Sequence, residues 1–266
     1  MTNKAWWGEF SIADQQHHCW QIDDRAIIIK RLENEWNSWN IETKQEAEGS
    51  IVHHKNCAIP ALELSDDKKI FGRYLQQNSA EKIHVFPLLA DRSVVARPAS
   101  PLTLFAGEKA RLYISTPIWF CAETLPKKTR LLDIPFWRPS DSWFGSSTMT
   151  GQLCYAKYTT ARVQLNNIEK RSHRAITPIT VVNHHDKALT IDRINVPVTL
   201  LHLFFDEHHQ LWTTAITIKR ENEGDNVELN LDNGAPAEAL STTLISPARD
   251  TSEQNTLIRS ISSLFG

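Results

Sequence analysis

The sequence has little of what defines a redox, zinc-binding or disulfide-rich protein. Its 266 residues include only four cysteines, Cys19, Cys57, Cys121 and Cys154, and none of them belongs to a C-x-x-C pair. This spacing argues against a zinc clip and against a thioredoxin-like redox motif. The first residues also lack the apolar core of a signal peptide. We therefore expect reduced thiols in a cytoplasmic protein.

The chain also lacks an excess of positive charge and a long apolar run. Its 29 lysines and arginines are offset by 31 acidic residues, which gives a formal net charge of −2. Nucleic-acid binding depends largely on basic charge, so no nucleic-acid partner is expected. No run approaches the roughly 18 apolar residues of a spanning helix, and no polybasic stretch is present. We therefore expect no membrane insertion.

Helical periodicity is scarce, and alternation of apolar and polar residues with period two dominates. We predict a mainly β fold that is antiparallel and β-sandwich-like. The predicted strands cover residues 20–32 (two pieces around a turn at Asp23 and Asp24), 35–43, 110–124, 152–165, 175–183, 189–198, 200–205 and 211–220. Residues 175–183 are apolar on both faces, which is typical of a central strand. Residues 35–43 are predicted to pair with residues 20–32, and the last four strands are predicted to form a meander.

The end of the chain is the exception, because it predicts an amphipathic helix within residues 247–266. Thr251 and Gln254 have the spacing of a capping box. The apolar residues Leu257, Ile258, Ile261, Leu264 and Phe265 would line one stripe of that helix. Such a stripe has to be buried against the body of the protein or against a partner.

A proline-punctuated stretch at residues 97–102 predicts a domain boundary. We expect a β-rich N-terminal unit at 1–98, a β-sandwich-like unit at 99–246 and a C-terminal helix at 247–266. One continuous large sandwich is the alternative.

Several segments together resemble a known family. They include "WWGEF" near the start, "STPIWF" in the middle, and the run from "SDSWFG" to "LCYAKYTTAR", which is the most specific part. Over nearly the whole chain the sequence resembles an uncharacterised bacterial and archaeal family, the domain of unknown function 432. The resemblance implies a soluble protein that works beside other cellular machinery. It implies no catalytic residues.

Residues 137–162 form the densest candidate binding segment. The side chains of Arg138, Asp141, Trp143, Tyr155 and Arg162, with Gly145 in the turn, would form the rim of a pocket for a small anion. Alternatively, Asp141 organises a turn, Trp143 fills the core and Gly145 permits an unusual backbone conformation. We favour the structural interpretation, and both remain open.

Histidine pairs are the second candidate site. If the meander holds, His184 and His185 in one loop would lie at the same end of the sheet as His208 and His209 in another. Imidazoles with neighbouring carboxylates suit a transition metal. However, adjacent residues on a strand point to opposite faces, and the spacing matches neither H-E-x-x-H nor a zinc finger. We therefore expect no metal and no cofactor.

The sequence carries no nucleophile elbow, no Walker loop and no dinucleotide fingerprint, so catalytic residues stay unknown. We predict a non-enzymatic β-sandwich module for protein–protein interaction or self-assembly. Its partner would be an unknown protein or a second copy. The alternatives are an anion-binding protein that uses the 137–162 segment and a metal-dependent enzyme or sensor at the paired-histidine loops.

Overall fold

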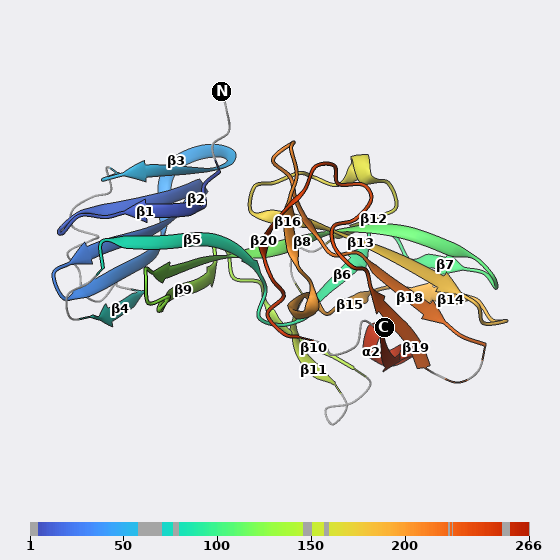
Figure 1. The fold of residues 1–266 in the computed structure, drawn as a ribbon. Coiled ribbons are helices and arrows are strands. Elements are labelled where there is room, and N and C mark those ends of the chain that lie inside the picture. The colour runs from blue at the N-terminus through green and yellow to red at the C-terminus, as the bar shows by residue number, and fades with distance from the viewer. Residues whose placement is uncertain are drawn as a thin grey trace. The chain divides into compact units, whose positions relative to one another are not determined.

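The computed structural model describes residues 5–57, 71–76, 80–145, 151–156, 160–222, 224, 226–251 and 256–265, and it is mainly β as predicted. The chain divides into two compact units (Figure 1). Unit 1 comprises Met1–Leu88 and Trp119–Arg138, and unit 2 comprises Leu89–Ile118 and Pro139–Gly266. Each unit is therefore discontinuous in sequence. The domain boundaries predicted at residues 98 and 246 refer to independently folding domains, and they stay a prediction.

Unit 1 is built around a long β-hairpin. Strand β2 (His17–Leu32) pairs antiparallel with β3 (Glu35–Lys55), which confirms the predicted pairing of these two segments. The turn predicted at Asp23 is wrong, because β2 continues through it. Asp23 has a φ of 45°, and its carboxylate accepts a hydrogen bond from the backbone N–H of Gly49 at 3.0 Å. The pairing of β2 with β3 therefore continues past Asp23 with a local shift in register.

Shorter strands complete unit 1. They are β1 (Gly8–Ser11), β4 (Gly72–Leu75), β5 (Lys82–Leu89), β9 (Arg130–Pro135) and the last part of β8 (Lys109–Thr124). The core is aromatic, since Trp20, Trp36, Trp39 and Phe120 are almost completely buried. The Trp20 indole also donates a hydrogen bond to the carbonyl of Trp6 at 2.9 Å, which satisfies its polar group inside the core.

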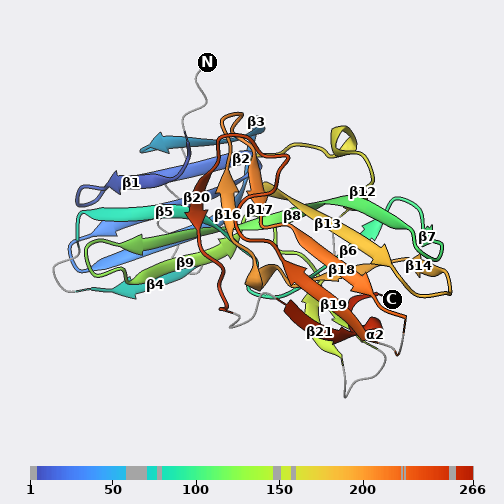
Figure 2. The same ribbon diagram turned by 45° about the vertical axis from the view of Figure 1, so that its right-hand side comes forward.

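Unit 2 is organised by a sheet whose strand order is β10-β11-β6-β12-β8-β13-β17-β16-β20 (Figures 1 and 2). A branch of β18, β19 and β21 leaves this path at β13. In addition, β15 pairs with β6, and β14 pairs with β7. The bounds in unit 2 are β6 (Val94–Pro98), β7 (Leu102–Leu104), β10 (Asp141–Phe144), β11 (Gln152–Tyr155), β12 (Thr160–Arg162), β13 (Arg174–Asn183), β14 (Leu189–Ile191), β15 (Ile194–Val196), β16 (Leu203–Phe205), β17 (Leu211–Thr213), β18 (Ile216–Arg220), β19 (Asn226–Leu231), β20 (Thr243–Ser246) and β21 (Thr256–Ser260). Two 3₁₀ turns cover Leu165–Asn167 and Val198–Leu200.

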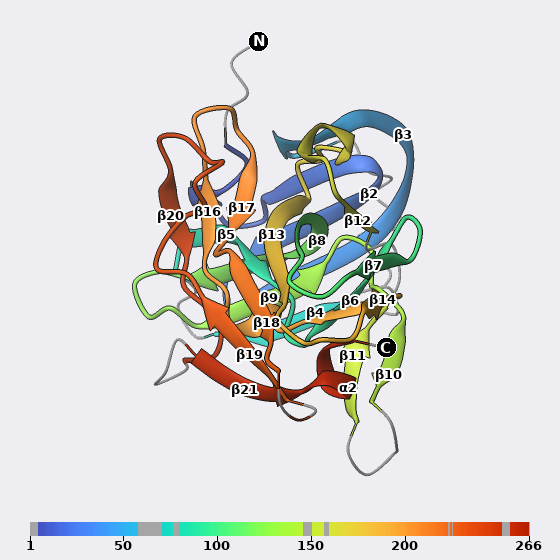
Figure 3. The same ribbon diagram turned by 90° about the vertical axis from the view of Figure 1, so that its right-hand side faces the viewer.

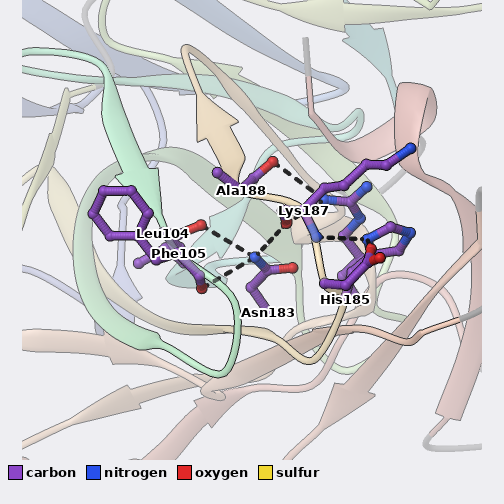
Figure 4. Close-up of polar contacts among 8 residues, drawn as sticks. Leu104, Phe105, Asn183, His185, Lys187 and Ala188 are labelled. Carbon is purple, nitrogen blue, oxygen red and sulfur yellow. Dashed lines mark hydrogen bonds and ion pairs between the residues drawn. The ribbon is translucent and has the colours of Figure 1, made fainter.

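The central strand was predicted correctly, but the meander around it is wrong. Strand β13 pairs antiparallel with β8 on one side and parallel with β17 and β18 on the other. The next strand, β14, pairs with β7 instead of returning along β13. The side chain of Asn183, at the end of β13, accounts for this change of direction. Its amide nitrogen donates to the carbonyls of Leu104, Phe105 and Lys187, which ties the turn to the end of β7 (Figure 4).

The segment 152–165 is also not the single strand that was predicted. It contains the separate short strands β11 and β12, followed by a 3₁₀ turn. Only the hairpin of β16 and β17 follows the expected pairing in this half of the chain. Period-two patterning thus identified strand-forming residues without revealing where the strands break.

The C-terminal helix is present, but it is only one turn long, α2 (Ile261–Leu264). Residues 256–260, which were expected to be helical, form β21 and pair with β19 (Figures 2 and 3). The expected stripe is broken because Ile258 is 75% exposed while Leu264 and Phe265 are buried. Phe265 forms a β-bridge with Ile194, so the helical turn packs on its own unit. The capping-box residue Gln254 lies outside the described residues.

Within the described part of the chain, no helix combines the length and the apolar character needed to cross a membrane.

Candidate functional site

The hairpin of β10 and β11 holds most of the predicted binding residues (Figure 3). Across its ladder, Asp141 lies opposite Tyr155, and Trp143 lies opposite Leu153. Because side chains alternate along a strand, these two pairs share one face. The other face carries Phe144 and Cys154, which are buried together with Val95. The hairpin therefore has one face in the core, whereas the other face is exposed at Trp143 and Leu153 and buried at Tyr155.

A polar network fixes the base of this hairpin. Arg92 donates a hydrogen bond from Nη1 to the Asp141 carboxylate at 3.0 Å, and its guanidinium lies 5.5 Å from the centre of the Tyr155 ring. The Tyr155 hydroxyl in turn donates to Asp91 at 2.9 Å. Because each charged group in this network has a partner, the network positions the hairpin rather than offering a vacant cation to an anion.

Trp143 does not fill the core, contrary to the structural interpretation of this residue. Its side chain is 45% exposed, and Leu153 opposite it is 46% exposed, whereas Phe144 takes the core position. The indole lies against the backbone of Gly151, where an added Cβ would clash with the indole nitrogen and lie 2.6 Å from Cε2. Gly145 has a φ of 143°, as expected for a glycine that permits an unusual turn. The absence of a side chain at Gly151 thus leaves room for the Trp143 indole.

The two remaining arginines of the predicted rim do not belong to the β10–β11 hairpin. Arg138 is an exposed residue at the end of the second segment of unit 1. Arg162 lies on β12, where its neighbour across the ladder is Tyr113 of β8. The structure therefore brings together Asp141, Trp143 and Tyr155, with Arg92 added. Leu153 was missed as a member of the surface pair, because alternation separates it from Cys154 without showing which of the two faces is exposed at that point.

The paired-histidine hypothesis for a metal site fails on topology. His184 and His185 follow the end of β13, whereas His208 and His209 precede β17, whose first residue pairs with Ala175 near the start of β13. The two loops therefore lie at opposite ends of β13 and do not converge. Among the residues that the structure describes, no group of three or more His, Cys, Asp or Glu side chains is placed to hold a metal.

Both histidine loops have structural explanations. In the second loop, the buried Asp206 carboxylate accepts hydrogen bonds from the backbone N–H groups of His208 and Gln210 at 2.9 and 2.8 Å, and from the Trp212 indole at 2.7 Å. In the first loop, Nδ1 of His185 accepts a hydrogen bond from the backbone N–H of Lys187 at 3.0 Å (Figure 4). These contacts close turns, which is a common use of such residues.

A pair of neighbouring thiols in unit 1 is a separate chemical feature. Cys19 is fully buried on β2, and Cys57 packs against the same cluster while remaining partly exposed. The hydrogen bond between the two thiols raises the pKa of Cys19 and lowers the pKa of Cys57. Thiolate character and exposure together determine the reactivity of a cysteine.

We expect Cys57 to be the first cysteine alkylated in the native protein. The other three side chains, Cys19, Cys121 and Cys154, are fully buried, so iodoacetamide should modify them at least about tenfold more slowly. Peptide mass spectrometry after timed labelling measures the four rates, with urea-unfolded protein as the control in which all four react. Equal labelling of Cys154 and Cys57 in native protein would contradict this arrangement.

Comparison with known proteins places the whole fold in one family. Residues 6–265 match the family model described as "Protein of unknown function (DUF432)". No curated protein and no solved structure matches the chain.

Proposed function

The chain belongs to the DUF432 family of proteins of unknown function, and we propose that it is a non-enzymatic assembly module in which β10 pairs with β10 of a second copy. One observation carries this proposal. Trp143 and Leu153 form an apolar pair, each nearly half exposed, on the terminal hairpin of the sheet in unit 2. Among the described residues, β10 pairs with β11 alone, and an exposed edge strand is a template for pairing with another chain.

The second copy is favoured over a different partner by symmetry and charge. Antiparallel pairing of one edge strand with itself is two-fold symmetric, so a single surface serves both copies. A formal net charge of −2 over 266 residues opposes self-association only weakly. The C-terminal helix is not a docking element in this proposal, because Leu264 and Phe265 are already buried in their own unit.

The position of Trp143 suits a contact residue. Tryptophan is enriched among the residues that dominate binding energies at interfaces. Gly151 leaves room for the indole, and the contact of Arg92 with Asp141 fixes the strand beside it. A preorganised side chain loses little entropy when a partner binds.

The anion-binding function at residues 137–162 has less support. Arg92, a cation beside the hairpin, is paired with Asp141 at 3.0 Å. A cytoplasmic location stays a prediction and is compatible with assembly through this edge.

Sedimentation velocity tests the proposal. We expect wild-type protein to show a reversible monomer–dimer equilibrium at about 1–100 µM, and Trp143→Ser to raise the dissociation constant at least about tenfold, since hot-spot truncations cost about 2 kcal/mol or more. Phe105→Ser is the matched control, because Phe105 is 70% exposed in the turn between β7 and β8. It should leave the dissociation constant unchanged.

Two results would overturn the proposal. One is wild-type protein that stays monomeric throughout this concentration range. The other is a dimer that Trp143→Ser and Phe105→Ser weaken equally, which would indicate general surface hydrophobicity instead of a defined edge.

A further inference from the structure

A cavity lies where the sheet of unit 2 divides. Strands β17 and β18 follow each other along one edge of β13, but their outer partners differ, because β16 pairs with β17 while β19 pairs with β18. Thr214 and Ala215 lie at the junction. The backbone N–H of Thr214 donates to the carbonyl of His202 on one side, and the carbonyl of Ala215 accepts from the N–H of Asp232 on the other. The two branches therefore diverge and leave a space between them.

The volume of this space is about 280 Å³, near the lower end of the roughly 300–1,000 Å³ typical of small-molecule sites. It is lined by residues from both branches: Leu200, His202, Thr214, Leu231, Asp232, Asn233, Gly234, Pro247, Ala248, Asp250 and Thr251. The size suits a molecule comparable to one amino acid.

Two hydrogen-bond donors of the wall have no acceptor among the described residues. Thr214 is 1% exposed, and its hydroxyl oxygen accepts from the backbone N–H of His202 at 3.1 Å, so its own proton remains available. Nδ1 of His202 accepts from the backbone N–H of Ala248 at 3.3 Å. In the neutral imidazole the proton must then be on Nε2, where no protein acceptor is recorded in the described part of the chain.

The lining is negatively charged. Asp232 and Asp250 contribute a formal charge of −2, and none of the described residues that line the cavity is a lysine or an arginine. Neither carboxylate has a hydrogen bond or an ion pair to another described side chain. Arg249, the basic residue next to Asp250, directs its Nε to the carbonyl of Leu89 at 2.7 Å.

From these groups we propose that this cavity binds a small organic cation that also carries a hydrogen-bond acceptor. A guanidinium or ammonium group would pair with Asp232 and Asp250. A carboxylate or carbonyl of the same molecule would accept from the Thr214 hydroxyl and from Nε2 of His202. The Thr214 hydroxyl still has a proton to donate after it accepts from His202, so an acceptor on the ligand would complete its hydrogen bonds. This site is distinct from the β10 edge and does not depend on the proposed self-association.

The test uses a matched pair of probes, L-arginine and L-citrulline, which have similar shapes but differ in the charge of the terminal group. Titration of ¹⁵N-labelled full-length protein should give saturable shifts at the amides of Thr214 and Gly234. We expect arginine to bind at least fivefold more tightly than citrulline. The double variant Asp232→Asn, Asp250→Asn should weaken arginine binding at least tenfold. Both residues are exposed, and the amide spectrum shows directly whether the variant is folded.

Asp192→Asn is the matched control, because Asp192 is an exposed aspartate of unit 2 that does not line the cavity. It should leave arginine binding unchanged. Three results would overturn the proposal: no saturable shift with arginine up to about 20 mM, which would leave at most marginal affinity; equal affinity for citrulline; or equal weakening by Asp192→Asn and by the double variant.

Discussion

Replacing Asn183 with leucine is expected to destabilise unit 2 by about 3 kcal/mol. Asn183 is completely buried, and its amide nitrogen donates to the carbonyls of Lys187, Leu104 and Phe105 at 2.9, 3.1 and 3.2 Å. Leucine has the same number of side-chain heavy atoms and the same branching at Cγ, but it would leave these carbonyls without that donor. The Asn183 Oδ1 atom has no recorded partner among the described residues, so its removal adds no cost. Urea unfolding measures the difference.

Asn195→Leu is the matched control for this prediction. Asn195 is 2% exposed, and its amide donates a single hydrogen bond, to the carbonyl of Ser263 at 3.2 Å. The expected loss is therefore about 1 kcal/mol. Equal losses of stability in the two variants would contradict the proposal that the hydrogen bonds of Asn183 tie the turn after β13 to the end of β7.

Lowering the pH from about 6.5 to 4 is expected to destabilise each unit by about 3 kcal/mol through one buried histidine. In unit 1, burial lowers the pKa of His18 to about 4, helped by His53, Lys55 and His17. In unit 2, burial lowers the pKa of His173 to about 3, helped by Arg174 and Arg171. Both side chains are less than 10% exposed.

The sign follows from proton linkage. Between pH 6.5 and the lowered pKa of the folded state, the unfolded chain binds a proton that the folded chain does not bind. The free energy of unfolding therefore falls as the pH falls. The stability that depends on the neutral form of the buried histidine is fully present above pH 6.5. For His18 the loss levels off below about pH 4, where the folded protein also binds the proton.

Urea unfolding between pH 7 and pH 4 measures this loss. His18→Gln should reduce the pH dependence of unit 1, while His208→Gln, at a side chain that is 71% exposed, should not change it. If His18→Gln and wild-type protein lose stability in parallel over this range, His18 is not the group that responds.

The sequence was sufficient for the β class and for local pairings. The β2–β3 and β16–β17 hairpins follow directly from alternating segments joined by short connections. Their partners are close in sequence, so no long-range information was needed. The central position of β13 also followed from its two apolar faces.

Non-local pairing could not be predicted from period-two patterning. Strand β13 pairs with β8 and with β18, both distant in sequence, and alternation identifies the buried face of a strand but not its neighbour. This one error placed the two histidine loops at the same end of a sheet. The residues of β21 could equally have formed a helical stripe, and pairing with β19 decided between the two.

The candidate site was partly predictable. The composition of residues 137–162 pointed to the hairpin and to Trp143, but the exposure of Trp143 depends on Phe144 occupying the core and on the space above Gly151. No pattern in the sequence predicted the cavity at Thr214. It arises from the different partners of β17 and β18, which belong to the topology.

Hydrogen exchange at low and high protein concentration tests the assembly through β10 most directly. If β10 pairs with β10 of a second copy, the amides within Asp141–Phe144 should become protected as concentration rises, and this gain should disappear in Trp143→Ser. Amides of β13, which is already paired on both sides, provide the internal reference. Exchange within Asp141–Phe144 that is the same at both concentrations, in a sample shown to dimerise, would place the interface elsewhere and contradict the proposal.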